Sequence, residues 1–160
     1  MKAEVEIMSL QQYKKNGYLA AGIGSLIGSA LLIYPGHFLG IGYVKMFMPN
    51  ATLDGIFPPF IGFIFGWWVG EVLGCWLALG LLRYRRAART AKLLVVMTPV
   101  GIFFWMLFHI FVINWIATII NQSNSIANLQ YITMPVTIAF VAIALSLKAR
   151  YLAQQNTSKI

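Results

Sequence analysis

The chain has 160 residues, of which 59 % are hydrophobic and only 10 % are charged, and its formal net charge is +8. A mean hydropathy of +0.75 and a charged fraction far below the ~25 % of soluble domains exclude a soluble globular protein and indicate one membrane domain. The basic residues stand in short clusters between long apolar runs and form no stripe on a soluble module, which excludes nucleic acid as the expected partner.

The apolar runs predict an all-α integral membrane protein, a bundle of four transmembrane helices. The expected segments, in chain order, are a tail at 1–16, a membrane domain at 17–147 with spans at about 17–34, 59–82, 93–120 and 129–147, and a tail at 148–160. Each span is near or above the ~20 residues that cross ~30 Å of hydrocarbon. No strand-like alternation competes with this pattern, and within hydrocarbon only helices or closed barrels satisfy their backbone polar groups.

One long outer loop is expected between the first two spans, from Pro35 to Pro58. It contains an apolar stretch of eleven residues at 38–48, which is too short to cross a bilayer. Pro49 and Pro58 are expected to interrupt helical structure on its far side. The sequence therefore predicts one interfacial or re-entrant element in this loop.

The basic residues predict that the N- and C-termini both lie on the cytosolic side. Three stand in the N-terminal tail, five between the second and third spans, and three in the C-terminal tail, while Lys45 alone falls in the other connections. Lys and Arg are enriched in the cytosolic segments of membrane proteins. The dense cluster in the second connection is also expected to bind anionic lipid, or to dock an acidic partner, at the cytosolic face. It comprises Arg83, Arg85, Arg86, Arg89 and Lys92.

Small residues recur at every fourth position of the first two spans. The stronger series is Gly62, Gly66, Gly70, Gly74 and Ala78 in the second span, and the weaker one is Ala20, Gly24 and Gly28 in the first. On a helix this spacing forms a ridge along which another backbone can approach closely. We expect the two ridges to pack against each other, or one of them to pack against a partner subunit.

A lone acid, Glu71, lies in the middle of the second span, next to the ridge. A charged carboxyl group there costs on the order of 3 kcal/mol, so burial favours its neutral form. Either a functional role or a hydrogen bond that fixes helix packing would explain it. His109 and Asn114 in the third span are expected to form interhelical hydrogen bonds. A Glu71–His109 pair would make a proton relay or a cation site, and two separate polar contacts are the alternative.

The sequence shows no catalytic constellation. Its acids are Glu4, Glu6, Asp54 and Glu71, and only the last lies deep in a span. The single cysteine, Cys75, follows Glu71 by four residues and so shares its helix face. With His109 it could offer ligands to a soft metal, but nothing supplies a further ligand. We therefore expect no metal, no cofactor and no enzymatic activity.

Two functions remain open. The first is a non-enzymatic accessory, assembly or scaffold subunit of a larger membrane complex, associating through the small-residue ridges with other membrane subunits. The second is a small homo-oligomeric transporter or channel, coupled to protons or cations through Glu71. The short tails favour the first function. The second is less favoured because a single carboxyl group within the spans is little to build a transport path on. The expected location is a bacterial inner membrane, with an organelle membrane as the alternative.

Overall fold

The computed structural model describes residues 2–48, 57–84, 86–113, 115–116, 118 and 123–155, and side-chain surroundings within 17–48, 58–84, 86–112, 115–116, 118 and 133–155. The helices are α1 (Lys2–Phe47), α2 (Phe57–Leu81), α3 (Ala87–Phe108), a π-helical segment η1 (His109–Ile113) and α5 (Ser123–Gln155). No strand occurs within these described residues.

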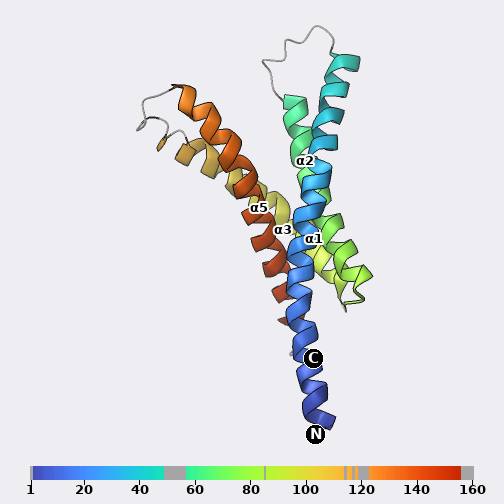
Figure 1. Ribbon diagram of the computed structural model, residues 1–160. Coiled ribbons are helices and arrows are strands. Elements are labelled where there is room, and N and C mark those ends of the chain that lie inside the picture. Colours follow the sequence, from blue (N-terminus) through green and yellow to red (C-terminus); the bar gives the residue numbers. More distant parts are fainter. Residues whose placement is uncertain are drawn as a thin grey trace.

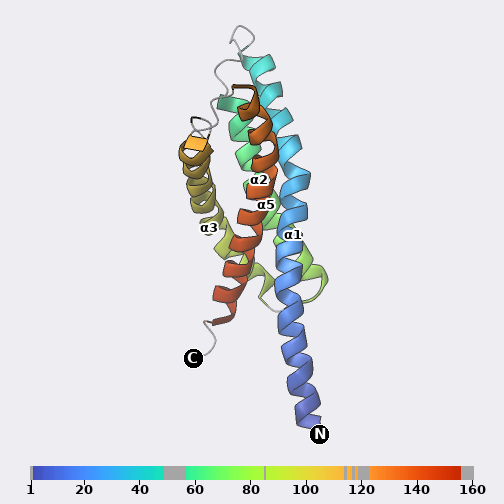
Figure 2. The ribbon, with the colours of Figure 1, turned by 60° about the vertical axis from the view of Figure 1, so that its left-hand side comes forward.

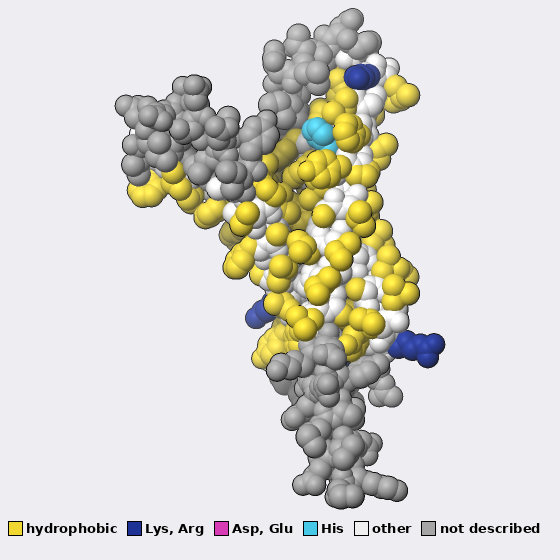
Figure 3. Space-filling view, viewed as in Figure 1, with side chains coloured by type: hydrophobic (Ala, Val, Ile, Leu, Met, Phe, Trp, Pro, Cys, Tyr) yellow, Lys and Arg dark blue, Asp and Glu magenta, His cyan; other side chains and the backbone are white. Residues whose placement is uncertain are grey.

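Four helical segments of the described chain are long and apolar enough to cross a membrane. They comprise Gly17–Phe47, Pro58–Leu81, Ala87–Val112 and Thr133–Gln155, with 31, 24, 26 and 23 residues. Apolar side chains cover much of the described part of the face seen in Figure 3. Large apolar side chains such as Leu31 and Phe140 are 66 % and 73 % exposed. For the described residues this confirms the prediction of an all-helical fold with four helices long and apolar enough to span a membrane.

The helices form two pairs, α1–α2 and α3–α5, with further contacts of α1 to α5 and of α2 to α3. The pairs converge where α1 enters its apolar segment and α5 ends, and they diverge toward the opposite end, which gives the molecule a V shape (Figure 1). Figure 2 shows the same helices from a second side, with α5 in front. We call the convergent end, near Gly17 and Gln155, the closed end, and the other, near Phe47 and Ser123, the open end.

Two clusters of buried side chains hold the pairs together. One lies toward the closed end and includes Leu79 and Leu94. The other includes Trp67 of α2 and Trp105 of α3, whose rings meet edge to face with centroids 5.2 Å apart. Aromatic pairs prefer this geometry, so the second cluster fixes α3 against α2 at the level where the pairs begin to diverge.

The first helix is longer than the sequence indicated. The loop expected to begin at Pro35 is a continuation of α1, and the apolar stretch up to residue 47 lies in the same helix, so an interfacial or re-entrant element is not confirmed. Proline removes a backbone hydrogen bond, but membrane helices tolerate it when neighbouring helices support them. A Cβ placed on Gly36 would lie 3.0 Å from the Cα of Gly66, so α2 supports α1 directly after Pro35. Residues 49–56 of the loop lie outside the described residues.

Other helix ends also differ from the expected bounds. The third helix begins at Ala87, not near 93, and passes into η1 at His109, while α5 continues to Gln155, past the expected end at 147. The sequence interpretation ended spans at the first basic residues. Long basic side chains can extend toward water while their backbone stays helical, so charge marks the membrane boundary and does not mark the end of the helix.

Candidate functional site

The small-residue ridges of α1 and α2 lie against each other. A Cβ placed on Gly28 would lie 2.7 Å from the Cα of Gly74, and one on Gly24 would lie 2.5 Å from the Cβ of Ala78. Only glycine permits such a backbone approach. The residues brought together are Ala20, Gly24 and Gly28 of α1 with Gly62, Gly66, Gly70, Gly74 and Ala78 of α2, and Gly36 and Gly40 extend the α1 series. Sequence reasoning missed these last two, although they keep the spacing of four beyond Pro35.

Glu71 lies beside this contact, where α1, α2 and α3 meet, and it is fully buried. From α1, the Ser25 hydroxyl donates to the backbone carbonyl oxygen of Glu71 at 3.4 Å. The indole N–H of Trp67, one turn earlier on α2, and the hydroxyl of Thr98 on α3 approach the Glu71 carboxyl group. Neither the carboxyl oxygens nor these two donors complete a hydrogen bond of normal geometry. We call Trp67, Glu71 and Thr98 the Glu71 cluster.

The chemistry of the Glu71 cluster suits a neutral carboxyl group. A protonated carboxyl group can donate one hydrogen bond and accept others, so it matches an indole donor and a hydroxyl group. Buried polar atoms are normally satisfied, and a small movement of these side chains would bring them within hydrogen-bond geometry. The cluster can therefore hold a proton on Glu71. No group of three His, Cys, Asp or Glu side chains that could hold a metal ion occurs in the part of the chain that the structure describes.

His109 belongs to a different polar contact, centred on Thr137 of α5. The Thr137 hydroxyl donates to the carbonyl oxygen of Thr133 at 2.8 Å and accepts from the indole N–H of Trp105 at 2.9 Å. Because the hydroxyl hydrogen is used, the 2.9 Å contact with Nε2 of His109 requires that Nε2–H donates. Thr137 thus joins α5 to both α3 and η1.

Glu71 and His109 therefore have different neighbours, and a direct pair between them is not among the described contacts. The Trp67–Trp105 ring contact is what links the two polar groups. Asn114 lies outside the described residues. Thr98 and Thr137 carry no signal in the sequence, because isolated threonines in a span are common and their partners are set by tertiary packing.

Thr137→Val and Thr98→Val form a matched pair that separates a hydroxyl with completed hydrogen bonds from one without them. Thr137→Val leaves the N–H groups of Trp105 and His109 without an acceptor, and we expect the free energy of unfolding to fall by about 1–3 kcal/mol. The Thr98 hydroxyl approaches Glu71 but completes no hydrogen bond of normal geometry, so we expect Thr98→Val to cost less. Reversible unfolding in mixed detergent micelles measures both. Equal losses would contradict the role assigned to Thr137.

A cleft lies between the two helix pairs on the side toward the open end. It has a volume of about 430 Å³ and is lined by α1, α2 and α5. Its walls are largely apolar, with Ile33, Phe63 and Ile138 among them, and His37 lies at its edge. The 3.2 Å contact of His37 Nδ1 with the carbonyl oxygen of Pro59 requires that Nδ1–H donates, because the carbonyl oxygen only accepts. In the neutral ring this leaves Nε2 as an acceptor.

Comparison with known proteins supplies no relative. The chain matches no protein-family model, no curated protein and no solved structure. The features that bear on function are therefore the cleft, the Glu71 cluster and the basic residues at the closed end.

The basic cluster expected to dock lipid or a partner divides into two kinds of residue. Arg86 donates from Nη1 to the carbonyl oxygens of Ala153 and Gln154, each at 3.2 Å. It thereby caps the carboxyl end of α5, where unsatisfied carbonyl groups and the helix dipole favour a cation. Arg83, Arg86, Arg89 and Lys92 are all exposed, so the second kind comprises Arg83, Arg89 and Lys92, for which no such cap is described, and Arg85 lies outside the described residues.

Arg150, which the sequence assigned to the C-terminal tail, is buried at the closed end and is only 4 % exposed. Its guanidinium group lies over the Tyr84 ring, 5.6 Å from the centroid, and Nη1 donates to the Thr90 hydroxyl at 3.5 Å. A Cβ on Gly17 would lie 3.0 Å from its Nη2. A signal for this burial existed, because small buried residues continue along α5 past position 147. They are Ala142, Ser146, Ala149 and Ala153.

Proposed function

We propose that the chain is a non-enzymatic accessory or assembly subunit of a larger membrane complex, and that the cleft between the helix pairs receives a transmembrane helix of a partner subunit. The observation that supports this is the divergence of the pairs toward the open end (Figure 1), beside an apolar cleft of about 430 Å³. Helices in lipid associate through close packing and interhelical hydrogen bonds, without a hydrophobic drive. A bundle whose arms stand apart therefore keeps packing surface available for another helix.

The ridge glycines support this choice of surface. Gly28 and Gly70 are in backbone contact across the α1–α2 interface, so the close-packing face of each ridge is already occupied within the chain. The cleft offers small and flexible lining instead, such as Ala30, Ala139 and Met134. A partner helix with a hydroxyl or amide donor at the level of His37 would match the Nε2 acceptor of its neutral ring.

Filling the cleft tests the proposal. Ala139→Trp occupies the cleft, whereas Val136→Trp places the same side chain about one turn away, at a position that is 63 % exposed and does not line the cleft. We expect native mass spectrometry after gentle detergent extraction to find a second polypeptide at fixed stoichiometry with the wild type and with Val136→Trp, and to find it lost with Ala139→Trp. Particles that contain only this chain, or equal behaviour of the two variants, would refute the proposal.

We also propose that the closed end faces the cytosol of a bacterial inner membrane. The Lys and Arg clusters support this orientation, and α1 begins and α5 ends toward the same end of the molecule (Figure 1). In a Cys75→Ser background, we expect Arg89→Cys to react with an impermeant maleimide only from the cytosolic side. Lys45→Cys, at an exposed position near the open end, is expected to react only from the outside. Labelling of Arg89→Cys from the outside and of Lys45→Cys from the cytosolic side would contradict the proposed orientation.

A transporter or channel that is coupled to protons or cations is the second candidate. The observation that favours it is the Glu71 cluster, in which a buried carboxyl group and two donors stand close together without completed hydrogen bonds. A titrating group in a transport path has this character. The two candidates differ in the expected effect of Glu71→Gln, which abolishes flux in a transporter and leaves partner binding intact in an accessory subunit.

A further inference from the structure

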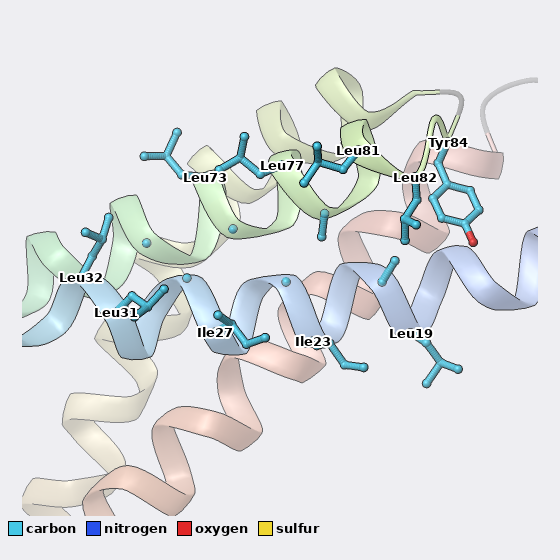
Figure 4. A pocket seen from close by; sticks show the side chains of 16 residues that line it. Leu19, Ile23, Ile27, Leu31, Leu32, Leu73, Leu77, Leu81, Leu82 and Tyr84 are labelled. Atoms are coloured by element: carbon cyan, nitrogen blue, oxygen red, sulfur yellow. The ribbon is translucent and has the colours of Figure 1, made fainter.

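A larger groove runs along the outside of the α1–α2 pair and shares no lining residue with the cleft. Its volume is about 770 Å³. Gly24, Gly28, Gly70 and Gly74 are among its lining residues, and long apolar side chains project on its two sides from α1 and α2 (Figure 4). Ile23 and Leu77 from these two sides are 55 % and 51 % exposed, so the groove opens toward the surrounding membrane.

The dimensions of the groove match one leaflet. Along α1 it extends from Leu19 to Leu32, which is about 20 Å at ~1.5 Å per residue. Half of a ~30 Å hydrocarbon core is about 15 Å. One end reaches Tyr84 at the closed end, and the other reaches Gly70 near the middle of α2. The groove is therefore long enough for one extended acyl chain that enters from the closed-end face.

The shape of the groove favours a lipid acyl chain over a protein helix. The glycines that line it are in contact with the opposite backbone, since a Cβ on Gly70 would lie 2.9 Å from the Cα of Ser29. The groove is thus a furrow between two touching helices. A helix with its side chains is ~10–12 Å across and would rest on the Ile and Leu side chains at the edges. A flexible hydrocarbon chain can enter the furrow.

An exposed basic residue, Arg83, lies in the chain between two residues of the closed end of the groove. The groove reaches Leu82 and Tyr84, and Arg83 between them is exposed. The backbone of Arg83 has φ 55°, a left-handed conformation that is uncommon for a residue with a side chain. The turn is held there by backbone hydrogen bonds from Arg83 N–H to the Gly80 carbonyl oxygen at 2.9 Å and from Tyr84 N–H to the Leu79 carbonyl oxygen at 2.9 Å. The fold therefore fixes the backbone of one exposed basic residue beside the closed end of an apolar groove.

We propose that this groove binds an anionic phospholipid of the leaflet at the closed end, with one acyl chain along the α1–α2 furrow and the headgroup phosphate near Arg83. The apolar lining and the length of the groove suit an acyl chain, and the positive charge of Arg83 suits an anionic headgroup. The site is independent of the cleft and of any partner subunit.

Lipid retention tests this site. The protein is reconstituted in vesicles of equal phosphatidylglycerol and phosphatidylcholine and exchanged into mild detergent, and the lipids that remain bound are counted by native mass spectrometry. We expect wild type to retain phosphatidylglycerol preferentially. Arg83→Gln is expected to lower that preference about fivefold, the effect of one basic residue near an anionic surface. Lys92→Gln removes an exposed cation of α3 whose sequence neighbours, unlike those of Arg83, do not line the groove; it is the charge control and should change the preference little.

A steric pair completes the test. Ile27→Trp fills the groove and is expected to reduce retention of both lipids, whereas Val96→Trp on α3, at a position 69 % exposed and outside the groove, is not. A photoreactive acyl chain on phosphatidylglycerol should crosslink to peptides that contain Ile23 or Leu77. Equal effects of Arg83→Gln and Lys92→Gln, retention of a fatty acid in place of the phospholipid, or crosslinks spread evenly over the exterior would overturn the proposal.

Discussion

Gly70→Leu is expected to separate α1 from α2 and to abolish the folded protein in detergent. A Cβ on Gly70 would already lie 2.8 Å from the carbonyl carbon of Gly28 and 2.9 Å from the Cα of Ser29. These are backbone atoms, so no side chain can move aside, and the helices themselves must part. Overpacking of a tight interior costs about 1–3 kcal/mol, and occasionally more. Because most of the helix contact follows this ridge, we expect Gly70→Leu to lower the free energy of unfolding by about 3 kcal/mol or more.

Gly80→Ala is the matched control for a milder change, Gly70→Ala. Both lie on α2, but nothing stands within 4 Å of a Cβ on Gly80. Alanine is the better helix former by about 0.5–1 kcal/mol, so Gly80→Ala is expected to stabilise slightly. Gly70→Ala is expected to destabilise by about 1–3 kcal/mol. Unfolding in mixed micelles measures both, and the same sign for the two variants would show that the ridge contact does not hold α1 to α2.

Glu71→Lys is expected to prevent folding or insertion, while Glu71→Gln is expected to fold nearly as the wild type does. The side chain at position 71 is fully buried among α1, α2 and α3. An amide keeps the carbonyl acceptor and a donor of the neutral carboxyl group and adds one N–H, so we expect Glu71→Gln to lower the free energy of unfolding by less than about 1 kcal/mol. A lysine ammonium group at the helix centre carries a penalty of about 3 kcal/mol. Yield of monodisperse protein and unfolding in mixed micelles report both changes.

Glu71→Gln also separates the two proposed functions. For an accessory subunit, Glu71→Gln keeps partner binding, and vesicles that contain the purified chain show no pH-dependent flux. For a transporter, such vesicles conduct protons or cations and Glu71→Gln abolishes the flux. A flux that is sensitive to Glu71→Gln would reverse our preference for the accessory function.

Much of the membrane architecture follows from the sequence, because hydrocarbon leaves few backbone solutions. Four apolar runs therefore predict four helices, and the spacing of Gly62 to Gly74 predicts a ridge. The continuation of α1 past Pro35 was not predicted, because the effect of a proline depends on what packs against the helix. The contact of Gly36 with Gly66 supplies that support.

The polar contacts were predictable only in part. The central position of Glu71 is visible in the sequence, but its neighbours Trp67 and Thr98 are not, because they depend on how α2 and α3 are rotated. His109 was expected to form an interhelical hydrogen bond, yet its partner Thr137 lies 28 positions away. Arg150 was assigned to a water-exposed tail because charge was taken to mark the end of the helix.

Photocrosslinking from inside the cleft tests the accessory-subunit proposal most directly. A photoreactive amino acid is placed at Ala139, which lines the cleft, or at Val136, which does not, and the protein is irradiated in its native membrane before extraction. The proposal predicts one discrete crosslinked polypeptide from position 139, with only lipid adducts from position 136. Lipid adducts alone from both positions would mean that the cleft is filled by lipid, and the proposed function would fall.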